Sequence, residues 1–194
     1  FVSVVAQKAE WGTFAWTAAL SVSYFLVMIA GPLLGAWADA RAAKKKLLAA
    51  STIVCVAATA ALALTGPGAI AWAVVFIIVS NFAYAIGENV CAAFLPEIAR
   101  PEALGRVSGW GWSLGYFGGL LALGLSLAWV MTAEARGSDT TAAVPGTMLI
   151  TAVVFALASL PTFLLLKERA TPAKEVAEAP DAIGRVWQTL RFAR

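Results

Sequence analysis

One carboxylate, Glu88, stands in the middle of the apolar stretch AYAIGENVCAA at residues 83–93. Asn81 and Tyr84 precede it with the spacing i, i+3, i+7, so on a helix the three polar side chains share one face. An amide, a phenol and a carboxylate on one face offer donors and an acceptor that could bind a solute or exchange a proton. What these groups do depends on the solvent around the stretch.

The composition of the chain indicates that this solvent is lipid. Of its 194 residues, 61% are hydrophobic and 13% are charged, and the mean hydropathy is +0.82. Soluble domains average about 45–50% apolar and about 25% charged residues. Because so few charges could not cover a soluble core of this hydrophobicity, the sequence predicts an integral membrane protein.

Uncharged runs locate the membrane-spanning helices, since a crossing helix needs about 20 apolar residues. The longest run, 47–87, is interrupted by Thr65-Gly66-Pro67-Gly68, a strong turn signal, and therefore predicts two helices. The fold class predicted is all-α, a polytopic transmembrane helical bundle. Its five spans are expected at 13–37, 47–64, 70–95, 107–131 and 146–166.

Basic residues predict the orientation of this bundle. The loops 38–46 and 96–106 and the tail 167–194 carry 12 Lys and Arg, against only Lys8 and Arg136 in the other connections. By the positive-inside rule the first group faces the cytoplasm. We expect a multi-pass protein of a bacterial inner (plasma) membrane. The net charge of +3 then reflects topology and requires no nucleic-acid partner.

The two ends of the chain suggest further segments. Phe1–Ala6 resembles the end of a preceding helix. The tail 167–194 reads as a cytoplasmic linker that contains an amphipathic helix at 181–194. In that helix Ile183, Val186, Trp187 and Leu190 share an apolar face, which is typical of a segment at the membrane surface.

In a membrane the position of Glu88 becomes informative. Eight residues separate it from Pro96, which places it about 12 Å inside the cytoplasmic end of its helix. Contact with lipid there would cost at least about 2.5 kcal/mol, so the side chain should face the protein interior or a wet cavity. It then either lines a translocation route or is a structural partner of Arg106 or of a lysine at 44–46. Both readings remain open.

Glycines mark a second feature. Gly111, Gly115 and Gly119 recur every four residues and share one face of the span 107–131. Small residues at this spacing let two membrane helices approach closely. We predict that these three glycines are helix-packing positions, either in a static contact or at a surface where helices slide.

The segment GPLLGAWADARAAKKKLL at 31–48 resembles the signature loop of the major facilitator superfamily. Gly35 matches the signature Gly, Asp39 the signature Asp and Lys44 a late basic position, while Arg41 stands one position from a basic site. Ala40, Ala42 and Ala43 depart from the pattern, which has a basic residue, Gly and another basic residue there. The resemblance implies a loop that contacts the other half of a transporter and helps switch between inward-open and outward-open states.

Three segments together resemble one branch of that superfamily, the Atg22-like vacuole effluxer or UMF1 branch. They are PLLGAWAD at 32–39, LPE at 95–97 and GRVSGWGWSLGYFGG at 105–119. The resemblance implies that the chain holds helices two to six, part of the N-terminal half of a twelve-helix fold. The first helix and the second half would be its partners, together with the lipid bilayer and a small-molecule substrate. Fungal members are linked to amino-acid efflux from the vacuole.

The leading hypothesis for function is therefore a secondary active transporter that works by alternating access and moves a small solute, possibly an amino acid. The chain has no His and neither a GxxxxGK[ST] loop nor a GxGxxG fingerprint, so we expect no enzyme activity, no metal and no cofactor. Cys55 and Cys91 fall in different spans and form no zinc pattern. The alternatives are a non-transporting membrane scaffold or receptor and a polytopic membrane enzyme, whose only candidate cluster is the 96–106 loop.

Overall fold

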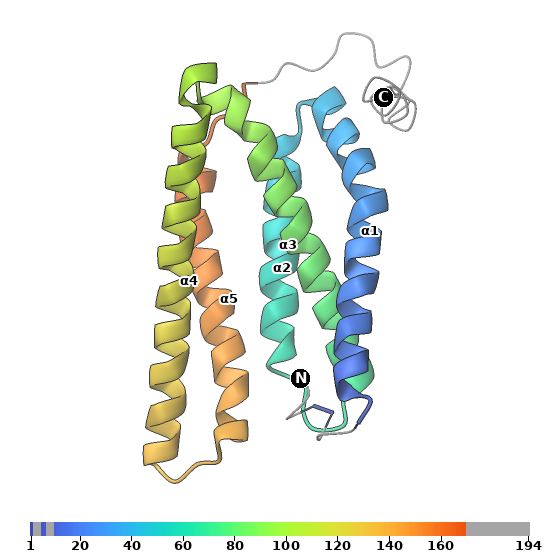
Figure 1. Cartoon of the computed structure of the whole chain (residues 1–194), viewed down its shortest axis with the longest axis vertical. Coiled ribbons are helices and arrows are strands. Elements are labelled where there is room, and N and C mark those ends of the chain that lie inside the picture. The colour runs from blue at the N-terminus through green and yellow to red at the C-terminus, as the bar shows by residue number, and fades with distance from the viewer. Residues whose placement is uncertain (2–4, 7–9, 170–194) are drawn as a thin grey trace.

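The computed structural model describes residues 1, 5–6 and 10–169, and five long helices account for most of this part of the chain (Figure 1). The prediction of an all-α fold is confirmed, and all five helices are long and apolar enough to cross a membrane. The helices are α1 (Gly12–Arg41), α2 (Lys44–Leu62), α3 (Ile70–Ile98), α4 (Leu104–Ala135) and α5 (Thr140–Leu165), with a short 3₁₀ turn η1 (Pro101–Ala103) before α4. The predicted surface helix at 181–194 lies outside the described residues, as do residues 2–4 of the segment Phe1–Ala6.

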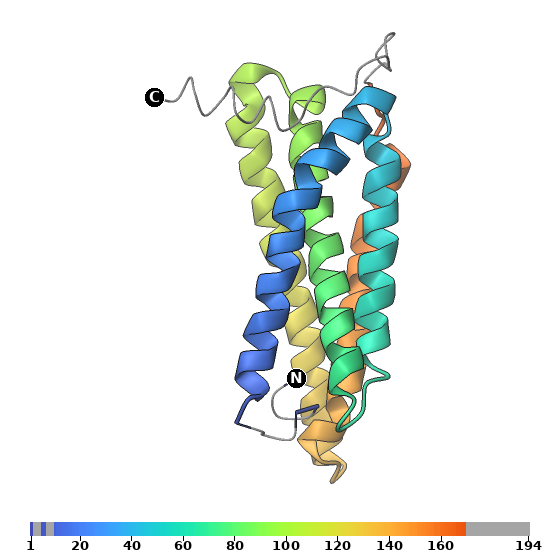
Figure 2. The ribbon, with the colours of Figure 1, turned by 90° about the vertical axis from the view of Figure 1, so that its right-hand side faces the viewer.

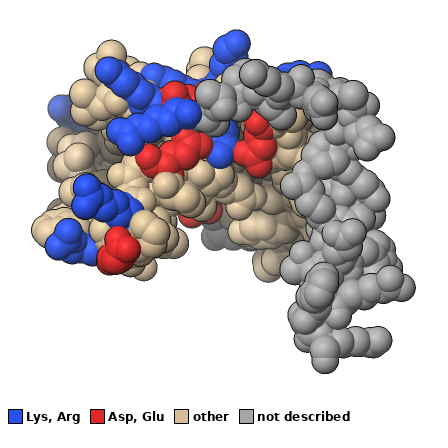
Figure 3. Space-filling view, turned by 90° about the horizontal axis from the view of Figure 1, so that it is seen from above, with Lys and Arg blue, Asp and Glu red and all other residues tan. Residues whose placement is uncertain are grey.

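Successive helices run in opposite directions, so every second connection lies at the same end of the bundle (Figures 1 and 2). One end holds residues 38–46, 96–106 and 166–169 and is called the basic end below. Seen from above, Lys and Arg side chains gather there with several Asp and Glu among them (Figure 3). The α2–α3 and α4–α5 connections lie at the opposite end.

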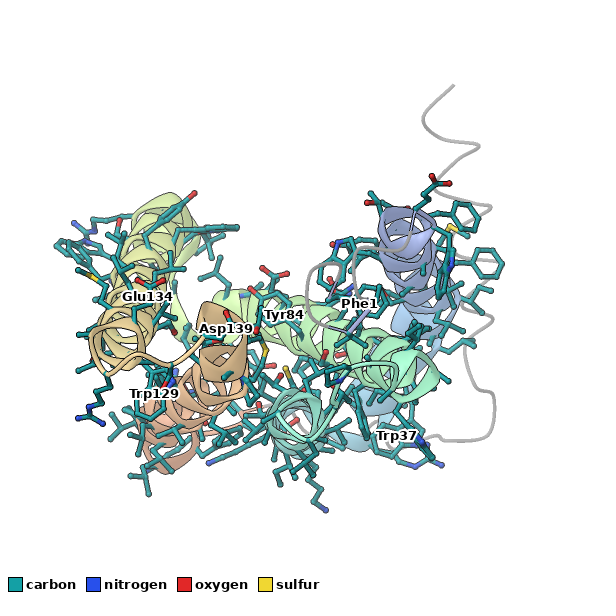
Figure 4. The ribbon with its side chains drawn as sticks, turned by 90° about the horizontal axis from the view of Figure 1, so that it is seen from below. Phe1, Trp37, Tyr84, Trp129, Glu134 and Asp139 are labelled. Atoms are coloured by element: carbon teal, nitrogen blue, oxygen red, sulfur yellow. The ribbon has the colours of Figure 1, made fainter. Side chains whose placement is uncertain are left out.

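The helices pack in two groups. In one group α3 packs against α1 and α2, and in the other α4 packs against α5. The two groups are joined mainly by α2 and α5, whereas α3 and α4 touch only slightly. Figure 4 shows the consequence from below: Trp129 lies on the α4–α5 side, Trp37 on the α1 side, and Tyr84 between them.

The apolar core of the described chain is small. Leu48 of α2 packs with Ile86, Val90 and Phe94 of α3. Large apolar side chains cover much of the outside of all five helices, and none of the residues of α4 is buried. Such a surface suits a protein that hydrocarbon and further protein segments surround, since soluble monomers rarely expose large contiguous apolar patches.

The turn between α2 and α3, predicted at Thr65-Gly66-Pro67-Gly68, is formed one residue later by Gly66-Pro67-Gly68-Ala69. The Ala69 amide donates to the Gly66 carbonyl at 3.1 Å, and Gly68 adopts φ +82°. Pro at the second position and Gly with a positive φ at the third are the features of a type II turn. The turn interrupts the longest uncharged run and so separates α2 from α3.

Candidate functional site: an interhelical cavity and a charged loop

A cavity of about 880 Å³ lies between the two groups of helices. Small-molecule sites usually enclose about 300–1,000 Å³. Its polar lining comes from Asn81, Tyr84 and Ser80 of α3, Thr59 and Cys55 of α2, Thr65 and Thr151. The remaining lining is apolar or glycine and comes from all five helices together with Phe1 and Val5. Two of the three predicted polar residues, Asn81 and Tyr84, therefore line this cavity.

Asn81 also holds the first group of helices together. Its side-chain amide donates to the Ser23 hydroxyl of α1, and Ser23 is fully buried. The Ser23 hydroxyl in turn donates to the Leu20 carbonyl at 2.8 Å. Asn81 thus combines a place in the cavity wall with a hydrogen bond between α1 and α3.

Tyr84 and Glu88 continue from Asn81 along α3, but Glu88 does not line the cavity. The Tyr84 ring lies against Phe155 of α5, with ring centroids 6.3 Å apart, and Glu88 lies about one helical turn further along α3. Glu88 is exposed in the described bundle, whereas Ile86 and Val90 are buried. Ile86 and Val90 each lie two residues from Glu88, which corresponds to a rotation of about 200° around the helix axis. Glu88 therefore faces away from the core that α1, α2 and α3 form.

Two of the predicted packing glycines, Gly115 and Gly119, line the cavity, and Gly111 does not. Gly118 lines it as well, so the glycine face that borders the cavity follows the spacing i, i+3, i+4 rather than strict steps of four. A Cβ added at any of these positions would meet nothing within 4 Å among the described residues. This face of α4 is therefore free to receive another helix, and the packing role stays a prediction.

The predicted switch loop forms a charged cluster at the basic end. The Lys44 ammonium lies 3.1 Å from an Asp39 oxygen and 2.8 Å from an oxygen of Glu97, near the end of α3. Lys44 and Glu97 are largely buried, with 14% and 15% of their side chains exposed, whereas Asp39 is 65% exposed. The shared lysine thus links α1, α2 and α3. Among the ion pairs of the described chain, Lys44 joins Asp39 and Glu97 rather than Glu88.

The other two predicted loop residues take no part in this cluster. The Arg41 guanidinium lies over the Trp37 ring, 5.4 Å from its centroid. Gly35 lines a small cavity of about 60 Å³ between α1, α2 and α3, which Asp39 and Lys44 also border. That volume accommodates a few waters and not a larger solute.

Glu97 and Glu168 contribute to the basic end but were not predicted as site residues. The Glu168 carboxylate accepts hydrogen bonds from the backbone amides of Lys44 and Lys45. Glu97 could have been found as the acid that ends an apolar helix on the same side as the lysines 44–46. No local pattern identifies Glu168, because its partners lie 124 and 123 residues away.

At Ala42 the loop differs from the signature that it resembles, and the backbone of this residue is strained. Ala42 adopts φ +47°, the left-handed conformation that residues other than glycine adopt only with strain. It closes α1 through bonds from the Ala43 amide to the Ala38 carbonyl at 2.9 Å and from the Ala42 amide to the Asp39 carbonyl at 3.3 Å. This is the Schellman motif, which usually has Gly at this position. The signature Gly is the residue that this backbone requires.

We predict that Ala42→Gly raises the free energy of unfolding by about 1 kcal/mol, because it removes the left-handed strain. The chain contains its own control in Gly137, which ends α4 in the same motif with φ +78°. Gly137→Ala should lower stability by a similar amount. Thermal unfolding in detergent measures both variants. A lower midpoint for Ala42→Gly would contradict the assignment.

Among the described residues, no group of three or more His, Cys, Asp or Glu is placed so that it could hold a metal ion. Cys55 is buried in the cavity wall and Cys91 is exposed, and both are free thiols. The cavity wall supplies hydrogen-bonding groups, and the loop at the basic end supplies charged groups.

Comparisons with known proteins identify the family of the chain. The family described as vacuole effluxer Atg22 like matches residues 2–105 and 102–193. A protein of Bacillus subtilis (strain 168), described as an uncharacterized MFS-type transporter YxiO, is 27% identical over 177 residues. That alignment covers 90% of this chain and 41% of the relative, so the chain spans less than half of that protein. No solved structure gives a significant match. The chain belongs to the Atg22-like vacuole effluxer family and is related to transporters of the major facilitator type.

Proposed function

We propose that these five helices are part of a secondary active transporter that moves a small solute across a membrane by alternating access. Amino acids are the first class of solute to test. The observation that carries the proposal is the cavity of about 880 Å³ between the helices, with the polar side chains of Asn81 and Tyr84 in its wall. Transporters of this kind bind their solute between helical repeats near the middle of the bilayer.

The described helices would form only part of the solute route. Because the chain spans 41% of its relative, we infer that further helices, including a first helix and a second half, complete the walls. The open glycine face at Gly115, Gly118 and Gly119 is a suitable place for one of them, since small residues allow close helix contact. Such a helix would narrow the cavity and bring its own side chains toward Asn81 and Tyr84.

Glu88 would face the remainder of the transporter. It lies opposite the core side of α3 and four residues after Tyr84, whose side chain borders the cavity. Exposure to hydrocarbon is costly for a carboxylate within a membrane helix, so a protein or water-filled space should cover this face. In that place Glu88 would bind a cationic group of the solute or exchange the proton that drives transport.

The charged cluster at the basic end would form one side of the conformational switch. Lys44 holds Asp39 and Glu97 together in the present arrangement, and the exposed Asp39 would be available to a second half that docks at this end. We infer that this end faces the cytoplasm of a bacterial cell, because it carries most of the Lys and Arg.

Replacing Glu88 with Gln in the full-length protein tests the coupling role. We expect uptake into reconstituted vesicles, driven by a pH gradient, to fall at least about tenfold, because the amide cannot carry a proton and a missing partner charge costs about 1.5–3 kcal/mol. Radiolabelled amino acids, supplied one at a time, measure this uptake.

The matched control is Glu102→Gln in η1, an exposed carboxylate at the basic end, which should leave uptake unchanged. Solute exchange without a pH gradient separates the two roles of Glu88. Exchange is retained if Glu88 only carries the proton and is lost if it binds the solute. Unchanged uptake and unchanged pH dependence in Glu88→Gln would remove Glu88 from the mechanism.

A further inference from the structure

Helix α2 begins with residues that are unfavourable for a helix start. Ala43 occupies the N-cap position and makes no side-chain cap, and three lysines, Lys44, Lys45 and Lys46, form the first turn. The first amides of a helix lack partners within the helix, and positive charges next to them oppose the helix dipole. The local sequence therefore does not stabilise the start of α2.

Glu168 supplies what the local sequence lacks. One carboxylate oxygen accepts from the Lys44 amide at 2.7 Å, and the other accepts from the Lys45 amide at 3.2 Å. The acid follows α5, which ends at Leu165. Its negative charge also lies next to the positive end of the α2 dipole. A residue that follows another helix thus takes the place of the missing N-cap.

The contact is reciprocal, because α2 also caps α5. The Lys45 ammonium donates to the carbonyl of Leu166, the C-cap residue of α5, at 2.6 Å. The backbone amide of Arg169 donates to Glu97 at 3.2 Å. The same Glu97 carboxylate holds Lys44. The end of α5 and the first residues after it are therefore bonded to the start of α2 and to the end of α3.

We propose that Glu168 is a positioning residue for the switch loop. With Lys45 it forms a reciprocal cap that joins the start of α2 to the end of α5. The loop that holds Asp39 and Lys44 consequently moves together with the segment that follows α5. The cap itself does not depend on transport, whereas its effect on the transport cycle rests on the proposed function.

Hydrogen exchange tests the cap in the full-length protein in detergent. Glu168→Ala should speed exchange of the Lys44 and Lys45 amides at least about fivefold, because losing a good N-cap has an effect of that order. Glu168→Gln keeps an acceptor oxygen and should give a smaller increase. Glu102→Ala is the matched control and should leave these amides unchanged. Equal exchange in Glu168→Ala and the unaltered protein would overturn the proposal.

Lys45→Met tests whether the two helix ends are joined. This change removes the ammonium that holds Leu166 but leaves the Lys44 and Lys45 backbone positions in place. We expect faster tryptic cleavage after Arg169 and also faster exchange of those two amides, because Glu168 loses its fixed position. Faster cleavage with unchanged amide exchange would show that the two ends act independently and would overturn the coupling.

Transport provides the functional readout. In vesicles, Glu168→Ala should lower the maximal uptake rate several-fold and leave the KM for the solute unchanged, and Glu168→Gln should restore part of the rate. A changed KM with an unchanged maximal rate would overturn the positioning role. If no solute is transported by the unaltered protein, the proposed function fails, while the exchange and cleavage experiments still decide on the cap.

Discussion

Gly146→Ala is expected to destabilise the α4–α5 pair by about 2–3 kcal/mol, because overpacking a filled site typically costs about 1–3 kcal/mol. A Cβ at Gly146 would lie 2.6 Å from Trp129 Cε2 and closer still to its ring nitrogen. Movement of the half-exposed Trp129 ring away from this Cβ disturbs its hydrogen bond, in which Nε1–H donates to the Ala143 carbonyl at 3.1 Å. Relief of the clash would break this bond between the two helices.

Thermal unfolding in detergent, followed by the loss of the monodisperse peak in size-exclusion chromatography, measures the effect. Gly124→Ala in α4 is the matched control, because a Cβ there meets nothing within 4 Å. That substitution should be neutral or stabilising by up to about 1 kcal/mol, which is the helix preference of Ala over Gly. A melting temperature for Gly146→Ala equal to that of the control would contradict the packing of Trp129 on Gly146.

Lys44→Met should destabilise the basic end by about 2–4 kcal/mol. The change removes the ammonium between Asp39 and Glu97 and leaves the largely buried Glu97 carboxylate without its lysine. Removing one partner of a fully buried pair costs about 3–5 kcal/mol, and the remaining exposure of Glu97 reduces this cost. The methionine keeps the apolar stem of the lysine, so the loss comes from the charge.

A double-mutant cycle separates the two acids. Glu97→Gln in the Lys44→Met background should restore most of the stability, because no buried charge then remains. Asp39→Asn should cost no more than about 1 kcal/mol, since the exposed Asp39 is screened by solvent. Equal costs for losing Asp39 and Glu97 would contradict the assignment of Glu97 as the main partner of Lys44.

The sequence by itself determined the fold class, because the bilayer imposes it. Long uncharged runs must form helices in hydrocarbon, where every backbone group needs an internal partner. The break at Pro67-Gly68 is equally local, since the turn requires Pro and a Gly with positive φ. The family also followed from local patterns at 32–39, 95–97 and 105–119, which need no knowledge of packing.

The spacing on one helix also brought Asn81 and Tyr84 together in the wall of one cavity, because a helical period is a property of the local chain. The same spacing did not predict that Glu88 would lie outside that cavity. Which face of α3 is covered depends on where α1, α2 and α5 pack, and that is a matter of tertiary structure.

Only the tertiary structure decided the partners of the charged and polar groups. Asn81 pairs with Ser23 of α1, and Lys44 pairs with Glu97 of α3. The start of α2 pairs with Glu168, which follows α5. Contacts between helices that are distant in the chain depend on crossing positions and rotations, which no local residue pattern encodes. The lysines 44–46 show the physical reason: their own segment makes a poor helix start, and a carboxylate 124 residues away stabilises it.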